Sequence, residues 1–93
     1  MATIDYRLAA PRQIEMQFND GAGDPIVDAD FKFGMQVDGV CETINGVLSG
    51  ELYQFDMATL DLTAQSYPVN IYTDSGDGWV WISEFELRVL GGC

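Results

Sequence analysis

A chain of 93 residues is long enough for one hydrophobic core and too short for two, so we expect a single domain over residues 1–93. Its 15 acidic and 4 basic residues give a net charge of −11, which argues against nucleic acids and anionic membranes as partners because both are polyanions. Histidine is absent, which removes Ser-His and Cys-His catalysis together with the commonest transition-metal ligand. We therefore expect a protein that is not an enzyme.

The cysteines and the two ends of the chain give further expectations. Cys41 and Cys93 are far apart in the sequence and form no zinc-binding pair. The first residues lack the basic start and apolar run of a signal peptide, and no apolar stretch reaches the roughly 18 residues of a membrane span. These features predict synthesis in the cytoplasm, where thiols stay reduced. Residues 91–93, Gly-Gly-Cys, are expected to form a flexible tail.

Apolar and polar residues alternate along most of the chain, which is the pattern of strands with one buried face. Residues 4–8 and 14–18 form the first two such runs, and Pro11 separates them because proline cannot donate to a sheet ladder. Residues 19–25 combine glycine, asparagine, aspartate and proline, so they predict a long hairpin tip or loop.

The centre of the chain contains the strongest strand and two dipeptides that favour tight turns. Residues 31–37 alternate regularly, and Asp38-Gly39 after them predicts a hairpin to residues 40–43. Asn45-Gly46 predicts a second hairpin, leading into residues 47–48. The middle of the chain is therefore expected to be a meander.

The second half of the chain repeats the strand pattern. A strand over residues 51–57 is followed by residues 58–65, which we expect to be a connection because threonine and aspartate disfavour a helix. Residues 67–71 alternate again, and Pro68 indicates that this strand begins at a sheet edge. Residues 74–78 predict a further hairpin.

The last strand, residues 79–90, changes phase. Its apolar residues are Val80 and Ile82 on one alternation, and Phe85, Leu87 and Val89 on the other. We therefore expect a bulge near residues 83–84. Seven to nine short strands with turns between them predict an all-β fold, either an antiparallel sandwich or a small barrel.

Carboxylates beside turns are the metal candidates of this sequence. They are Asp20, Asp24, Asp74 and Asp77. Oxygen clusters on loops hold Ca²⁺, but no EF-hand spacing is present, and an aspartate in a turn is already explained by hydrogen bonds to its own backbone. We therefore expect no metal and no cofactor, with these four as weak calcium candidates.

Two indoles are the candidates for an interaction surface. Trp79 and Trp81 share one alternation, opposite Val80 and Ile82. If Val80 and Ile82 face the core, both indoles lie on the surface and form an interface candidate together with Tyr72 and Pro68. The alternatives are aromatic side chains that fill the sandwich core and aromatic side chains that stack on sugar rings.

A series of features in a fixed order carries a resemblance to a known family. They are Asp24-Pro25-Ile26, the alternating residues 29–33, Asp38-Gly39, residues 49–52, residues 67–71, Gly76-Asp77-Gly78-Trp79 and a final strand over residues 85–89. From Ile14 to Leu90 the chain resembles the small Ig-like β-sandwich domains of tailed-bacteriophage virion proteins, including the N-terminal domain of baseplate upper proteins and tail-fibre and head-decoration modules.

The resemblance implies an Ig-like sandwich that serves as a non-enzymatic virion protein of the capsid or tail. Its partners would be other virion proteins and further copies of itself, as a homo-oligomer, and its location would be the virion. A competing class is an acidic phage-encoded inhibitor that presents carboxylates to a basic host protein where phosphates would lie. A third class is a carbohydrate-binding module, which requires exposed aromatic side chains around a groove.

Overall fold

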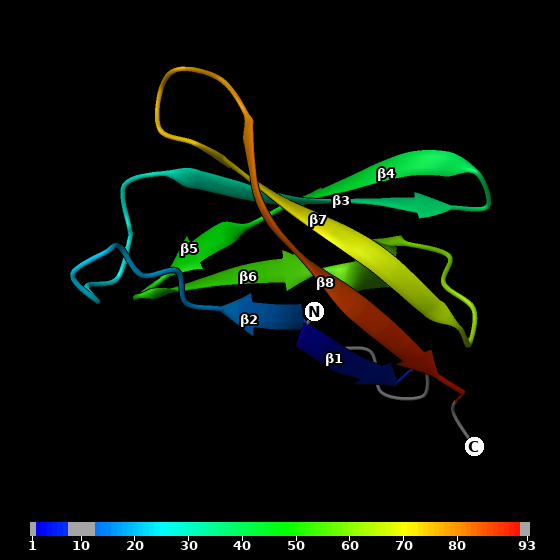
Figure 1. Cartoon of the computed structure of the whole chain (residues 1–93). Helices are drawn as coiled ribbons and strands as arrows, with labels where there is room; N and C mark the ends of the chain where they lie inside the picture. The colour runs from blue at the N-terminus through cyan, green and yellow to red at the C-terminus, as the bar shows by residue number, and fades with distance from the viewer. Residues whose placement is uncertain (1, 8–12, 92–93) are drawn as a thin grey trace.

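The chain folds into two facing β-sheets (Figure 1). The structure is a computed structural model, and it describes residues 2–7 and 13–91. The strands are β1 (Ala2–Arg7), β2 (Gln13–Met16), β3 (Asp30–Val37), β4 (Val40–Asn45), β5 (Val47–Ser49), β6 (Leu52–Asp56), β7 (Ser66–Asp74) and β8 (Val80–Leu90), with one short 3₁₀ turn, η1 (Met57–Thr59). One sheet has the order β1-β8-β7-β3-β4 and the other the order β2-β6-β5. The predicted sandwich is confirmed, and the sheets do not close into a barrel.

The order of the strands is that of an Ig domain. β2, β6 and β5 take the places of strands B, E and D, and β4, β3, β7 and β8 those of C′, C, F and G. All neighbouring pairs within the sheets are antiparallel except one, because β1 runs parallel to β8 from Ala2 opposite Phe85 to Arg7 opposite Leu90. The expected antiparallel pairing therefore fails at this edge of the larger sheet.

A tyrosine corner closes the connection between the two sheets at the start of β7. The Tyr67 hydroxyl accepts a hydrogen bond from the backbone N–H of Thr63 at 3.0 Å and another from the Gln65 side-chain amide at 2.9 Å. This is the feature that Ig sandwiches place at the start of strand F. Two residues later, where antibody domains carry a cysteine, the chain has Val69, which is completely buried. Apolar packing therefore takes the place of a disulfide between the sheets.

The predicted apolar faces form the core. Phe33 of β3 and Phe55 of β6 are both completely buried and stack with their ring centroids 3.7 Å apart, which joins the two sheets at their centre. Phe18, just after β2, stacks on Phe31 with centroids 3.8 Å apart. Together with their aliphatic neighbours these rings supply most of the apolar burial that stabilises the fold.

Asn45-Gly46 is not a hairpin turn, so the predicted meander is wrong at this point. β4 belongs to the five-stranded sheet and β5 to the three-stranded sheet, and the chain crosses between them here. The Gly46 N–H donates to the Phe31 carbonyl at 2.8 Å. A Cβ atom on Gly46 would lie 2.8 Å from the Phe55 ring, so glycine is required for close packing across the crossing.

The edge position predicted from Pro68 is only locally correct. β7 lies between β8 and β3 and is therefore an inner strand. Its pairing with β3 runs from Asp74 opposite Asp30 to Asn70 opposite Gly34 and stops there. Pro68 lies beyond that end, in the part of β7 that pairs with β8 alone among the described residues. The missing N–H of proline is thus tolerated at this position.

The bulge in β8 lies one residue earlier than predicted, and it changes which side chains are buried. Ile71 pairs with Ser83 and Tyr72 pairs with Trp81, so Ile82 is the extra residue. Val80 is 57% exposed and Ile82 is 42% exposed, so the condition under which the indoles were expected at the surface, that these two residues face the core, is not met. The three-stranded sheet does not cover this part of the hairpin, whose tip projects from the sandwich in Figure 1. We call residues 72–82 the β7–β8 arm.

Candidate functional site

A glycine and a tyrosine form the floor of a groove on the outer face of the five-stranded sheet. Gly34 of β3 lies opposite Asn70 of β7, and Lys32 lies opposite Tyr72. A Cβ atom on Gly34 would lie 3.0 Å from the Tyr72 ring. The absence of a side chain at Gly34 therefore lets the Tyr72 ring lean over the backbone of β3, as aromatic residues do beside glycines in sheets.

Lys32 joins two aromatic rings above this floor. Its ammonium group lies 4.3 Å from the centroid of the Trp79 ring and 5.6 Å from that of the Tyr72 ring. Such cation–π contacts contribute about 0.5–1 kcal/mol at exposed sites. They hold Trp79, which lies just before β8, against Lys32 of β3.

The second indole is fixed by a hydrogen bond. The Trp81 Nε1–H donates to the Asn70 side-chain oxygen at 3.0 Å. Trp81 is 53% exposed and Trp79 is 42% exposed, so both indoles present apolar area to solvent while their orientation is set by polar partners. This is an arrangement suited to an interface, because rigid aromatic side chains lose little entropy on binding.

The outer-face groove encloses about 560 Å³. Its lining includes Lys32, Cys41, Pro68, Asn70, Tyr72 and Trp79. Three of the four interface residues predicted from the sequence are therefore gathered in one groove, and Trp81 adjoins it through Asn70. Sequence reasoning missed Lys32 and Asn70, which are polar residues at outward positions of β3 and β7.

Charge is distributed unevenly between this face and the rest of the molecule. The strand register places the following charged residues at outward positions of the five-stranded sheet: Arg7, Lys32, Arg88, Asp5, Asp30, Asp74, Glu84 and Glu86. All the lysine and arginine side chains of the described residues are in this set. The other ten carboxylates of the chain lie elsewhere, with no described cation among them. The outer face is therefore nearly balanced in charge on a strongly acidic protein.

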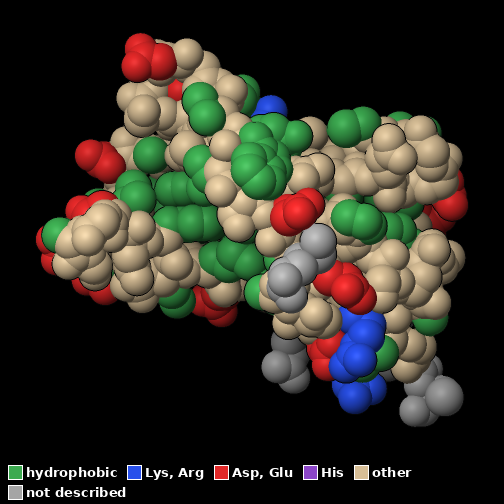
Figure 2. All heavy atoms as spheres, viewed as in Figure 1, with side chains coloured by type: hydrophobic (Ala, Val, Ile, Leu, Met, Phe, Trp, Pro, Cys, Tyr) green, Lys and Arg blue, Asp and Glu red, His purple; other side chains and the backbone are tan. Residues whose placement is uncertain are grey.

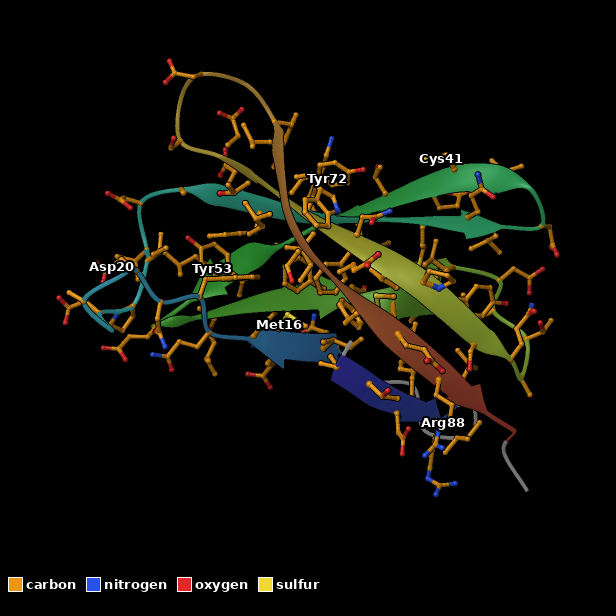
Figure 3. The ribbon with its side chains drawn as sticks, in the orientation of Figure 1. Met16, Asp20, Cys41, Tyr53, Tyr72 and Arg88 are labelled. Atoms are coloured by element: carbon orange, nitrogen blue, oxygen red, sulfur yellow. The ribbon has the colours of Figure 1, made fainter. Side chains whose placement is uncertain are left out.

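An ion pair lies at the far end of this face. Arg88 of β8 donates to both carboxylate oxygens of Asp5 of β1, at 2.8 and 2.9 Å (Figure 3 labels Arg88). The hydrogen bond from Arg88 lowers the pKa of the Asp5 carboxyl, and slight burial opposes this effect. The pair links the two parallel strands in addition to their backbone hydrogen bonds.

Two of the four calcium candidates, Asp20 and Asp74, cap their own turns. One carboxylate oxygen of Asp20 accepts from the backbone N–H groups of Ala22 and Asp24, at 2.9 and 3.0 Å. One oxygen of Asp74 accepts in the same way from two glycine N–H groups of its turn, at 2.7 and 3.2 Å. Within residues 2–7 and 13–91, no group of three or more carboxylate or cysteine side chains is placed to hold a metal ion.

Cys41 is exposed on β4 and is a free thiol, whereas Cys93 lies outside the described residues, as does most of the predicted tail. No helix in the described part of the chain is long and apolar enough to cross a membrane. Comparison with protein-family models, with curated proteins and with solved structures finds no match to this chain.

Proposed function

We propose that this protein is a non-enzymatic assembly module that docks onto other proteins through the outer-face groove, in the setting of a bacteriophage capsid or tail. The observation that carries the proposal is the gathering of oriented, exposed aromatic side chains on the face of lowest net charge. A face that is apolar, rigid and nearly balanced in charge meets the requirements of a protein interface. The virion setting rests on the resemblance of the sequence.

The face is better suited to docking than the edge of the same sheet. β4 is an edge strand, and its register places Glu42 opposite Met35, on the side that faces the core. An inward-pointing charge on an edge strand discourages the addition of a further strand, because pairing would bury the carboxylate. Assembly through the face avoids this cost.

The size of the face fits association between two copies. Five strands spaced about 4.8 Å apart, each with about seven paired residues at about 3.3 Å per residue, give a projected face of roughly 550 Å² per copy. Two such faces come close to the lower limit of stable interfaces, about 1,200 Å² in total. We therefore expect a weak, concentration-dependent homodimer, with a dissociation constant on the order of micromolar.

Light scattering over a range of protein concentrations tests this. The mass is expected to rise from monomer to dimer between about 1 μM and 1 mM, and Trp79→Ala is expected to weaken dimerisation about tenfold. Val47→Ala is the matched control, because Val47 is 66% exposed on the other sheet. A protein that stays monomeric at every concentration, binds no component of the particle and is absent from purified particles would refute the proposal.

A carbohydrate-binding function is the second candidate, since the groove does carry exposed aromatic rings. Two contacts argue against it. The Lys32 ammonium occupies a face of the Trp79 ring that a sugar would need for stacking, and the Trp81 N–H is already bonded to Asn70. Binding to a glycan array that is lost in both tryptophan variants, without any protein partner, would favour this alternative.

A further inference from the structure

A second hollow lies at the other side of the β7–β8 arm, between the arm and the loop that joins β2 to β3 (residues 17–29). It encloses about 640 Å³, and Ile26, Val27, Phe31 and Ile82 supply its apolar lining. Figure 2 shows a hollow with a hydrophobic floor between two projecting parts of the surface that carry acidic side chains. We call this hollow the end cleft. It shares no lining residue with the outer-face groove.

The end cleft leaves large apolar side chains open to solvent. Val27 is 46% exposed and Ile82 is 42% exposed. They come from segments more than fifty residues apart in the sequence, so the fold brings them together from opposite walls of the cleft. The bulge at Ile82 is responsible for this, because the extra residue in β8 shifts the alternation there.

Hydrogen bonds hold the loop wall of the cleft in place before any partner arrives. The Ile26 N–H donates to the Phe18 carbonyl at 2.7 Å, and Asn19 forms a β-bridge with Pro25. The Tyr53 hydroxyl of β6 donates to the Ala29 carbonyl at 2.6 Å. A loop tied in this way loses little entropy when a ligand binds, which is the condition for a preformed docking site.

The rim of the cleft carries one sign of charge. Asp20 and Asp28 line the cleft itself. A neighbouring hollow of about 530 Å³ shares Val27 and Asp28 with it and adds Asp30 and Asp74. No described lysine or arginine lines either hollow. Asp30 and Asp74 also lie directly opposite each other in the sheet, so their carboxylates repel one another. A cation between them would reduce this repulsion.

These observations identify the kind of partner. We propose that the end cleft binds an extended segment of a second, basic protein, in which an apolar side chain enters between Val27 and Ile82 and flanking lysines or arginines meet Asp20, Asp28, Asp30 and Asp74. A further copy of this chain fits the cleft poorly, because each copy has a net charge of −11 and its Arg88 is already paired with Asp5. Figure 3 shows Asp20 and Arg88 at opposite ends of the molecule.

The probe is a fluorescein-labelled eight-residue peptide of the sequence Lys-Lys-Leu-Lys-Val-Lys-Lys-Ser, measured by fluorescence anisotropy against the whole chain. A peptide with serine in place of leucine and valine separates apolar from purely ionic binding. A peptide with glutamate in place of lysine tests whether binding requires positive charge on the peptide. We expect binding of the first peptide that weakens at least tenfold in the serine peptide, is absent in the glutamate peptide and decreases with added salt.

Two variants locate the peptide on the protein. Ile82→Ser is expected to weaken binding about tenfold, whereas Val47→Ser, at a more exposed valine of the other sheet, leaves it unchanged. The double variant D28N/D30N is expected to weaken binding about fivefold, and E15Q/E51Q, which changes the net charge by the same amount at exposed positions outside both hollows, less than twofold. Circular dichroism confirms that each variant is folded.

Three results would overturn the proposal. Equal losses in D28N/D30N and E15Q/E51Q would mean that net charge alone attracts the peptide. Unchanged binding in Ile82→Ser would remove the cleft as the site. Self-association of the protein that is abolished by Ile82→Ser would show that the occupant is a further copy of this chain. Ile82 does not line the outer-face groove, so Ile82→Ser tests the end cleft and Trp79→Ala tests dimerisation through the groove separately.

Discussion

Replacing Tyr67 by phenylalanine removes a single hydroxyl group from the corner between η1 and β7. That hydroxyl accepts from the Thr63 backbone N–H at 3.0 Å and from the Gln65 amide at 2.9 Å, and the Tyr67 ring is 5% exposed. The substitution keeps the buried ring and deletes only the hydroxyl, which also forms a hydrogen bond with the Thr63 hydroxyl at 3.2 Å. It therefore isolates the contribution of the tyrosine corner from that of the core.

The expected loss follows from which donor is left without a partner. Thr63 and Gln65 are both exposed residues and both hydrogen bonds are part-buried, but the Gln65 side chain can turn to water, whereas the Thr63 N–H is fixed by the backbone beside the Tyr67 ring. An N–H group left unsatisfied in such a place costs about 1–3 kcal/mol. We expect Tyr67→Phe to lose about 1.5 kcal/mol. In a domain of this size that loss lowers Tm by about 6–12 °C.

Urea unfolding followed by circular dichroism measures the loss. Tyr72→Phe is the matched control, because the Tyr72 hydroxyl makes no hydrogen bond to the described residues, and we expect it to change the free energy of unfolding by less than about 0.5 kcal/mol. If the two variants unfold at the same urea concentration, the hydroxyl of Tyr67 does not stabilise the corner and the reasoning is refuted.

Three further predictions concern packing, pH and salt. Gly46→Ala is expected to cost about 1–3 kcal/mol in urea unfolding, because its methyl group meets the buried Phe55 ring, whereas Gly21→Ala, with open space around it, leaves the midpoint unchanged. Arg88→Gln is expected to lower the urea midpoint at pH 7. The pKa of Asp5 is depressed in the folded state, so the benefit of the pair is present above its unfolded pKa of about 3.9 and is lost as pH falls through the folded value. The two midpoints should therefore converge near pH 2, and a difference that persists there contradicts this account. Raising NaCl from about 0.01 to 0.15 M shortens the Debye length from about 30 to 8 Å, so Tm is expected to rise by several degrees in a chain of net charge −11; an unchanged Tm would mean that repulsion does not limit stability.

The two turn dipeptides show what a local pattern predicts and what it does not. Asp38 and Gly39 both have positive φ, 52° and 79°, which is the geometry of a tight hairpin turn, and the predicted hairpin is present. Asn45-Gly46 carries an equally strong signal, yet the chain changes sheets there. The reason is the packing of Gly46 against Phe55, which depends on a contact between segments distant in the sequence.

The arm shows a second limit of the sequence pattern. Alternation in β8 correctly predicted two phases and a bulge, and the residues of its second phase, Phe85, Leu87 and Val89, are buried in the core. It left open whether Val80 and Ile82 face the core, and both are exposed. Alternation tells which residues share a face of a strand, but it does not tell where the opposing sheet ends. That end depends on the short strands β5 and β6, which are defined elsewhere in the chain.

The distribution of charge on the surface also depends on how distant segments of the chain come together, and it bears on both proposals. A count of residues gives −11 but does not show that the described cations lie at outward positions of one sheet. Two copies that meet through that nearly balanced face keep most of their carboxylates apart, because ten of them on each copy lie elsewhere on the molecule. A basic partner is drawn to the acidic end cleft instead. Salt should therefore act in opposite directions: it strengthens association between copies by screening their like charges, and it weakens binding of a cationic segment. A single titration of both equilibria with NaCl distinguishes the two surfaces without any mutation.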